Sequence, residues 1–317
     1  MKINQTKERS YNVQNIIDIY RNINNLYNDE FTKKFLSIIL SHEKLKELSS
    51  LNKPTTLLTV GKSGSGKTFM VESILNRLKK PFIMTDIKQF SEVGYQGKDL
   101  IDVFQEFLIK EDYNMEAVEN GIIIFDEFDK LRAKESSQRD ISGLSIQHSL
   151  LKILDGIDIT IINNDNRRSM GSQIHVNTSN MIFIFIGAFS YLNNDYSKIQ
   201  QKLIDTGFSL ELINRINYIL ETKDYNKDVL LQYLNINNPV SPLHKYLKLF
   251  ESLGCTLVFE NIEQTLLGLI NDSFKIDYSF RGIEFLVNNM FTPYICDVII
   301  NNVREIKIIN TQVKLIT

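Results

Sequence analysis

The chain contains the run Gly61-Lys62-Ser63-Gly64-Ser65-Gly66-Lys67-Thr68, which fits the phosphate-binding pattern G-x-x-x-x-G-K-[ST] and directly follows the apolar run Thr55-Thr-Leu-Leu-Thr-Val60. The apolar run predicts a buried strand, and the apolar spacing from Phe69 to Lys80 predicts a helix after the loop. In such a unit the glycines let consecutive N–H groups and the helix N-terminus face an anion. This stretch therefore predicts a nucleotide-binding α/β fold.

Within this loop, we expect Lys67 to reach the terminal phosphates and to take part in catalysis, and Thr68 to ligate Mg²⁺ as well as the nucleotide. The other nucleotide contacts predicted in this stretch are Gly61, Ser63, Gly64, Ser65, Gly66 and Phe69.

A second nucleotide motif ends another apolar run, Gly121-Ile-Ile-Ile-Phe125, which is followed by Asp126 and Glu127. In P-loop enzymes an acid at this place holds the hydrated Mg²⁺, and an adjacent glutamate orients and deprotonates the attacking water. We assign Asp126 to the nucleotide and its metal, and Glu127 to catalysis. The alternative, a solvated turn, is disfavoured because the two motifs stand in the right order on two predicted strands. The sequence predicts an ATP hydrolase with ATP and Mg²⁺ as cofactors.

The composition limits the functional classes. The chain has 317 residues, 43% of them hydrophobic, which is enough for two globular domains. A net charge of −2 gives no electrostatic sign of a general nucleic-acid binder. The two distant cysteines, Cys255 and Cys296, favour a reducing compartment. No signal peptide is recognised, and no run approaches the ~20 apolar residues of a membrane span. We expect a cytoplasmic protein without a membrane partner.

Apolar runs and helical spacings alternate in the first two thirds of the chain, which predicts a parallel sheet between helices. The expected strands are 55–60, 81–85, 121–125 and 181–186, and the expected helices include 69–80, 100–109 and 144–154. Beyond Thr222 helical spacing dominates, with sparse short strands. We therefore expect a large nucleotide-binding domain over 1–222, which includes N-terminal helices, and a small, mostly helical domain over 223–317.

Further segments resemble the ClpX-like AAA+ ATPases of the Clp/Hsl unfoldase family. The run Gly94-Tyr95-Gln96-Gly97-Lys98-Asp99 is similar to the family's substrate-gripping pore loop, 119–130 resembles its Walker B segment, and 139–156 is similar to the two motifs that follow. The resemblance covers roughly residues 25 to 290. It implies an AAA+ P-loop NTPase domain followed by a small helical domain. It also implies a homo-oligomeric ring, usually a hexamer, with protein substrates or adaptors as partners.

The resemblance assigns roles to individual side chains. Arg215 lies in a segment similar to the arginine-finger helix, which would make it catalytic toward the neighbour's γ-phosphate, and Arg281 matches the sensor motif that contacts the nucleotide in its own subunit. For both arginines a surface ion pair is the alternative. Tyr95, with Gln96 beside it, would press on substrate polypeptide without reading its sequence. An ordinary surface tyrosine is the alternative there.

The chain also departs from the family pattern. The zinc-binding domain and the I-G-F peptidase-docking loop of the family have no counterpart, so a peptidase partner is doubtful. Gln96 replaces an aliphatic residue of the pore loop, Asn28 a glycine of the turn that precedes the domain, and Glu284 the second arginine of the sensor motif. No polar residue marks a sensor at the end of the 181–186 strand.

These observations predict an ATP-dependent unfoldase or remodeller that threads polypeptide through a hexameric pore. The main rival is a nucleic-acid-linked AAA+ switch, such as a helicase loader or transposition regulator. The near-neutral charge and the aromatic loop disfavour it, so nucleic acid is not expected as a partner. A subunit that binds nucleotide without hydrolysing it is a third alternative, which Lys67, Glu127 and Arg215 disfavour.

Overall fold

The computed structural model describes residues 29–90, 99–132, 141–163, 172–193, 195–222, 227–276 and 280–316. The predicted pore-loop residues Tyr95 and Gln96, and also Asn28, lie outside these ranges. The polar stretch 221–227, where the two expected domains meet, is described only at its two ends.

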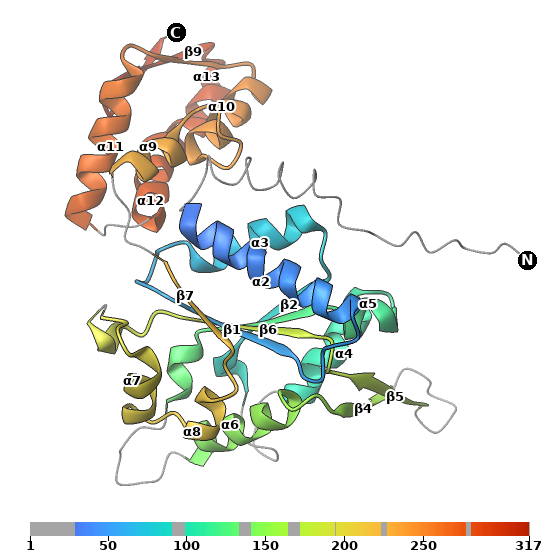
Figure 1. Cartoon of the computed structure of the whole chain (residues 1–317). Coiled ribbons are helices and arrows are strands. Elements are labelled where there is room, and N and C mark those ends of the chain that lie inside the picture. The colour runs from blue at the N-terminus through green and yellow to red at the C-terminus, as the bar shows by residue number, and fades with distance from the viewer. Residues whose placement is uncertain are drawn as a thin grey trace, which may run out of the picture.

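A parallel sheet forms the centre of the first unit, which consists of the described residues from 29 to 222 (Figure 1). Its strand order is β2-β3-β6-β1-β7, and every neighbouring pair runs parallel. The strands are β1 (Thr55–Val60), β2 (Phe82–Asp86), β3 (Ile122–Asp126), β6 (Ile182–Gly187) and β7 (Tyr218–Glu221). The predicted parallel sheet is confirmed, with β7 as an edge strand that the sequence did not reveal.

Helices cover both faces of this sheet because both faces are apolar. On β6, Ile182, Ile184 and Ile186 pack into the cluster on the face of α2 and α3, whereas Phe183 and Phe185 pack into the cluster on the opposite face. The helices of this unit are α2 (Asp29–Glu47), α3 (Lys67–Leu78), α4 (Leu100–Lys110), α5 (Met115–Glu119), α6 (Ile141–Ile153), α7 (Ile199–Asp205) and α8 (Leu210–Ile213). The sheet is therefore buried between two helical layers.

Short elements complete the unit. A two-stranded antiparallel hairpin pairs β4 (Asp158–Asn163) with β5 (Ser172–Asn177). The 3-10 turns are η1 (Ile87–Gln89) after β2, η2 (Phe128–Leu131) after β3, and η3 (Ser190–Leu192) after β6. All three turns follow the carboxyl ends of strands, where ligands bind in open α/β sheets.

The remaining described residues form a second group of helices with a small sheet. The helices are α9 (Lys227–Leu234), α10 (Pro242–Ser252), α11 (Ile262–Ile276), α12 (Phe280–Phe291) and α13 (Ile295–Asn301), with the 3-10 turn η4 (Thr292–Tyr294) between the last two. The strands β8 (Thr256–Phe259), β9 (Glu305–Ile309) and β10 (Gln312–Ile316) make a three-stranded sheet. The apolar cluster on the α2–α3 face continues into these helices, so the two groups share apolar packing.

One helical stretch, Phe280–Asn301, is long and apolar enough to cross a membrane by length and composition alone, with 22 residues and a mean hydropathy of 1.3. This corrects the expectation that no run approaches such a length. The core helix of a globular domain meets the same criterion; here Ile283, Val287 and Phe291 are fully buried, although only 28% of the apolar window is buried as a whole. The stretch is therefore weak support for a membrane span.

Candidate nucleotide-binding site

The phosphate-binding loop joins the end of β1 to the start of α3, as the sequence predicts. Two of its glycines are required by geometry. Gly61 passes so close to Thr222 that a Cβ on it would lie 1.9 Å from the Thr222 Oγ1. Gly66 precedes α3 with a φ of 70°, a left-handed conformation that favours glycine. The Ser65 hydroxyl lies 2.9 Å from the same Thr222 hydroxyl, which ties the loop to the end of β7.

Lys67 is the first residue of α3, and only 7% of it is exposed. Its Nζ donates hydrogen bonds to the carbonyl oxygens of Gly61 and Lys62, each at 2.7 Å. Burial lowers the pKa of Lys67 to about 8, partly offset by the nearby Asp126, so the ammonium keeps its proton at pH 7. A protonated lysine inside an N–H-rich loop is suited to bind a phosphate.

Thr68 and Asp126 meet across the site. The Thr68 hydroxyl donates to the Asp126 Oδ2 at 2.9 Å, although 58 residues separate them in the chain. The contact joins the start of α3, which follows β1, to the end of β3, which is separated from β1 in the sheet by β6 alone. Mg²⁺ in phosphate sites takes hydroxyl and carboxylate oxygens together with phosphate oxygens. This donor pair fits the predicted Mg²⁺, and Thr68 and Asp126 are the residues that would hold it.

Glu127 follows Asp126 in a left-handed conformation with φ 58°, which is unusual for a glutamate. Its N–H donates to the Asp126 Oδ1 at 2.7 Å, which stabilises this turn. The Glu127 Oε2 lies 3.6 Å from the Lys88 Nζ and 4.0 Å from the Lys130 Nζ. Backbone strain of this kind persists where the surrounding structure over-determines a functional residue. Both contacts are long and exposed, so the two lysines place positive charge beside the carboxylate without fixing its position.

The lining of the cavity includes residues that the sequence analysis did not select. The cavity has a volume of about 320 Å³. Six of its lining residues were not singled out from the sequence: Glu72, Asp129, Gly187, Ala188, Tyr233 and Phe280.

Asp129, 2% exposed, accepts from the Ala188 N–H at 3.1 Å and pairs with Lys130 at 2.7 Å. Burial, and then the nearby Asp126, raises the pKa of Glu72. The signal that could have found Glu72 is its spacing, one helical turn after Thr68.

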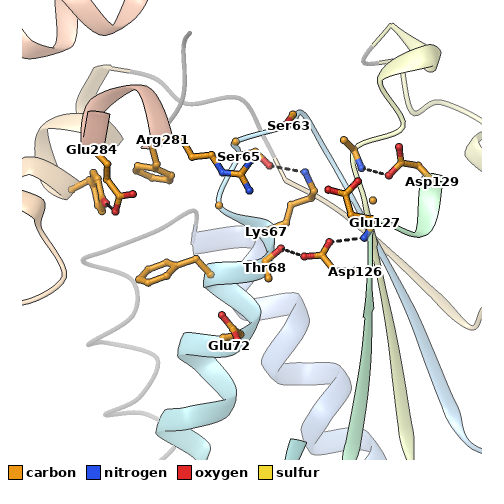
Figure 2. Close-up of a pocket in the computed structure, with 17 residues that line it drawn as sticks. Ser63, Ser65, Lys67, Thr68, Glu72, Asp126, Glu127, Asp129, Arg281 and Glu284 are labelled. Atoms are coloured by element: carbon orange, nitrogen blue, oxygen red, sulfur yellow. Dashed lines mark hydrogen bonds between the residues drawn. The ribbon is translucent and has the colours of Figure 1, made fainter. Parts of the chain in front are cut away.

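Arg281 and Glu284 enter the same cavity from α12 (Figure 2). Figure 2 shows the Arg281 side chain extending toward Ser65 and Lys67, whereas Glu284 lies farther from the loop. The positive charge of Arg281 contributes to the lowered pKa of Lys67, which reflects their proximity. The cavity is thus bounded by the first unit on one side and by the small helical unit on the other.

The predicted residues that line this cavity are Ser63, Gly64, Ser65, Gly66, Lys67, Thr68, Phe69, Asp126, Glu127 and Arg281.

Arg215 is not among the described residues that line the cavity. Its Nε and one terminal nitrogen donate to the two Asp155 oxygens at 3.0 and 2.9 Å. The backbone at Arg215 is fixed as well, because its carbonyl accepts from the Thr56 hydroxyl on β1. In the single chain, Arg215 therefore forms an ion pair, which was the alternative to an arginine finger. The role as an arginine finger in an assembly stays a prediction.

Comparisons with known proteins agree with this geometry. The family described as "AAA domain (Cdc48 subfamily)" matches residues 52–219, more than half of the chain. The chain is similar to the "ATP-dependent Clp protease ATP-binding subunit ClpX 2" of Wolinella succinogenes, with 28% identity over 265 residues, 77% of this chain and 66% of that protein. It is also similar to the "ATP-dependent Clp protease ATP-binding subunit ClpX" of Bacteroides thetaiotaomicron, with 28% identity over 315 residues, 87% of this chain and 75% of that protein.

The matched segment contains both nucleotide motifs and the sheet that positions them. The chain therefore belongs to the AAA family of P-loop domains. Together with the two relatives, this confirms the prediction of a ClpX-like AAA+ ATPase, an enzyme that hydrolyses ATP. The chain spans 66% of the length of the first of these relatives.

Proposed function

We propose that the protein is an ATP-dependent unfoldase or remodelling enzyme that threads polypeptide through the pore of a hexameric ring and acts without the usual peptidase. The observation that carries this proposal is the cavity shared by the two units. Arg281 from α12 and Lys67 from the loop line one site, so a change at the phosphates acts on both units at once. Nucleotide-driven closure between domains is a general way to produce movement.

At the site itself, each residue has a chemical task. Lys67 and the loop N–H groups bind the β- and γ-phosphates, and Arg281 neutralises charge on the γ-phosphate from the other side. Thr68 and Asp126 would hold Mg²⁺, which would neutralise charge on the phosphate oxygens. Glu127 accepts the proton of the attacking water and orients its oxygen toward the γ-phosphorus. Lys88 and Lys130 place positive charge beside the Glu127 carboxylate.

The partners and the location follow from the same proposal. The homo-oligomer would place Arg215 of each subunit against the nucleotide of its neighbour once the Asp155 pair opens. Both relatives are ATP-binding subunits of an ATP-dependent Clp protease, which supports protein substrates for this chain. Under this proposal the protein has no nucleic-acid partner and is located in the cytoplasm.

Two linked experiments test threading. Electron microscopy of Glu127→Gln with ATP should show six subunits around an axial channel, with Tyr95 facing it. In the second experiment, Tyr95→Ala should lower ATP-dependent unfolding of a fluorescent protein with a flexible tail far more than it lowers hydrolysis. Tyr113→Ala, at an exposed tyrosine of the same unit, is the matched control and should lower neither.

Two results would overturn the threading mechanism. One is Tyr95 on the outer wall of the assembly. The other is equal unfolding by the Tyr95→Ala and Tyr113→Ala proteins.

A further inference from the structure

The end of the cavity farthest from the phosphate loop carries a carboxylate held by a tyrosine. The Tyr233 hydroxyl on α9 donates to the Glu284 Oε1 on α12 at 2.9 Å. The Tyr233 ring also packs edge-on against Phe280, with 4.4 Å between the ring centroids. All three residues line the same cavity as Lys67. The small helical unit therefore supplies two aromatic rings and one oriented hydrogen-bond acceptor.

Charge decides which part of a nucleotide can meet Glu284. A carboxylate repels the triphosphate oxygens, and Arg281, one turn earlier on α12, already faces the phosphate loop (Figure 2). Glu284 must therefore face the neutral half of the nucleotide. The adjacent rings of Tyr233 and Phe280 make this end of the cavity apolar, which favours the flat base over the hydroxyl-bearing ribose.

We propose that Glu284 determines base specificity by accepting a hydrogen bond from the exocyclic amino group of adenine. Tyr233 is its positioning residue: its hydroxyl occupies one acceptor site of the carboxylate and fixes the rotamer, which leaves other lone pairs for the base. A base that carries a carbonyl oxygen in place of the 6-amino group presents an acceptor to an acceptor and is disfavoured. This inference rests on the proposed use of ATP and adds the group that selects it.

Binding of ATP and of purine riboside triphosphate, which lacks only the 6-amino group, tests this assignment. Kd values are measured with the Glu127→Gln protein, in which ATP stays intact. ATP should bind on the order of tenfold more tightly than the analogue, because a hydrogen bond to a charged group has about that effect. Glu284→Leu should bring the two Kd values to within about twofold of each other. Tyr233→Phe should retain part of the preference.

The controls separate the base from the ribose and from the phosphates. Glu251→Leu, at an exposed glutamate of α10 outside the cavity lining, should keep the full preference for ATP. The contrary result would have two parts. Glu284→Leu would lose the preference for ATP over 2′-deoxy-ATP, and it would keep the preference for ATP over purine riboside triphosphate. This result would assign Glu284 to the ribose and overturn the proposal. Equal Kd values for ATP and the analogue in the parent protein would overturn it too. A parent protein that binds none of the nucleotides would instead contradict the proposed function.

Discussion

The two walls of the nucleotide cavity are built in different ways. The wall of the first unit consists of the continuous segment β1–loop–α3 and of the end of β3. Lys67 in this wall is almost completely buried. The wall of the small unit comes from α9 and α12, whose residues Arg281 and Glu284 are exposed in the chain. The phosphate end is therefore fixed by the fold, whereas the opposite end depends on how the two units meet.

The largest effect is expected on the fixed wall. Glu127→Gln removes the base that accepts the proton of water but keeps the shape of the side chain, so hydrolysis should fall by about 10²- to 10⁴-fold. ATP affinity should stay close to that of the parent protein, since Lys67 and the loop N–H groups are unchanged. Phosphate release and binding of a fluorescent ATP analogue measure the two quantities. Hydrolysis within threefold of the parent rate would remove Glu127 from catalysis.

A smaller effect is expected on the wall of the small unit. Arg281→Gln should lower kcat/KM for ATP on the order of tenfold to a hundredfold, because it removes one charged hydrogen-bond donor while the loop still binds the phosphates. Arg304→Gln, at an exposed arginine before β9, is the control and should have no effect. If Arg281→Gln is as inactive as Glu127→Gln, the two walls contribute equally to ATP hydrolysis, which contradicts the contrast between them.

The packing of α2 against β1, the strand that leads into the phosphate-binding loop, should lose stability in acid. The His42 ring on α2 contacts the Thr55 hydroxyl at 2.8 Å and the Asn180 carbonyl oxygen at 3.0 Å, which joins α2 to β1. Burial lowers the pKa of His42 to about 4. Because the unfolded chain takes up this proton near pH 6.5 and the folded chain does not, this stability is present above pH 6.5 and is lost as the pH falls toward 4.

Chemical denaturation at pH 7 and pH 5 measures this effect. The fall in the free energy of unfolding between the two pH values should be about 2 kcal/mol smaller in His42→Gln than in the parent chain. The exposed His148 provides the control, His148→Gln, which should keep the parent's fall. An equal fall in all three proteins would contradict a neutral, buried His42.

The smallest effect concerns Asp155. Asp155→Asn breaks an ion pair whose side chains are 34% and 31% exposed, so the free energy of unfolding should fall by less than about 1 kcal/mol. Hydrolysis by the assembled protein should not fall, because the substitution frees Arg215 to reach a neighbouring nucleotide. Thermal denaturation and phosphate release at high protein concentration measure both. A tenfold loss of hydrolysis would instead give the ion pair a positioning role.

The same contrast explains what the sequence could predict. The predicted strands 121–125 and 181–186 agree with β3 and β6 to within one residue, because apolar runs buried on both faces are strong signals. The edge strand β7 was missed because only Leu220 of its four residues is buried. The hairpin of β4 and β5 was missed too, and the short strands expected beyond Thr222 could not be placed, since short strands carry weak patterns.

The residues of the site also fall into a group that the sequence could predict and a group that it could not. Contiguous motifs placed Lys67, Thr68, Asp126 and Glu127, and their side chains meet in one cavity. Tyr233 and Phe280 could not be selected, because they are ordinary core residues in sequence and become cavity residues only when α9 and α12 pack together. Thr222 was missed for a similar reason: its contact with Ser65 depends on the pairing of β7 with β1.

We infer that one nucleotide is held between the two walls of a single chain. A crystal structure of the Glu127→Gln protein with ATP and Mg²⁺ tests it most directly. We expect the triphosphate on the 61–68 loop, with the Arg281 guanidinium of the same chain bonded to the γ-phosphate. A triphosphate on the loop with Arg281 turned to solvent, or with its place taken by an arginine of another subunit, would contradict the claim.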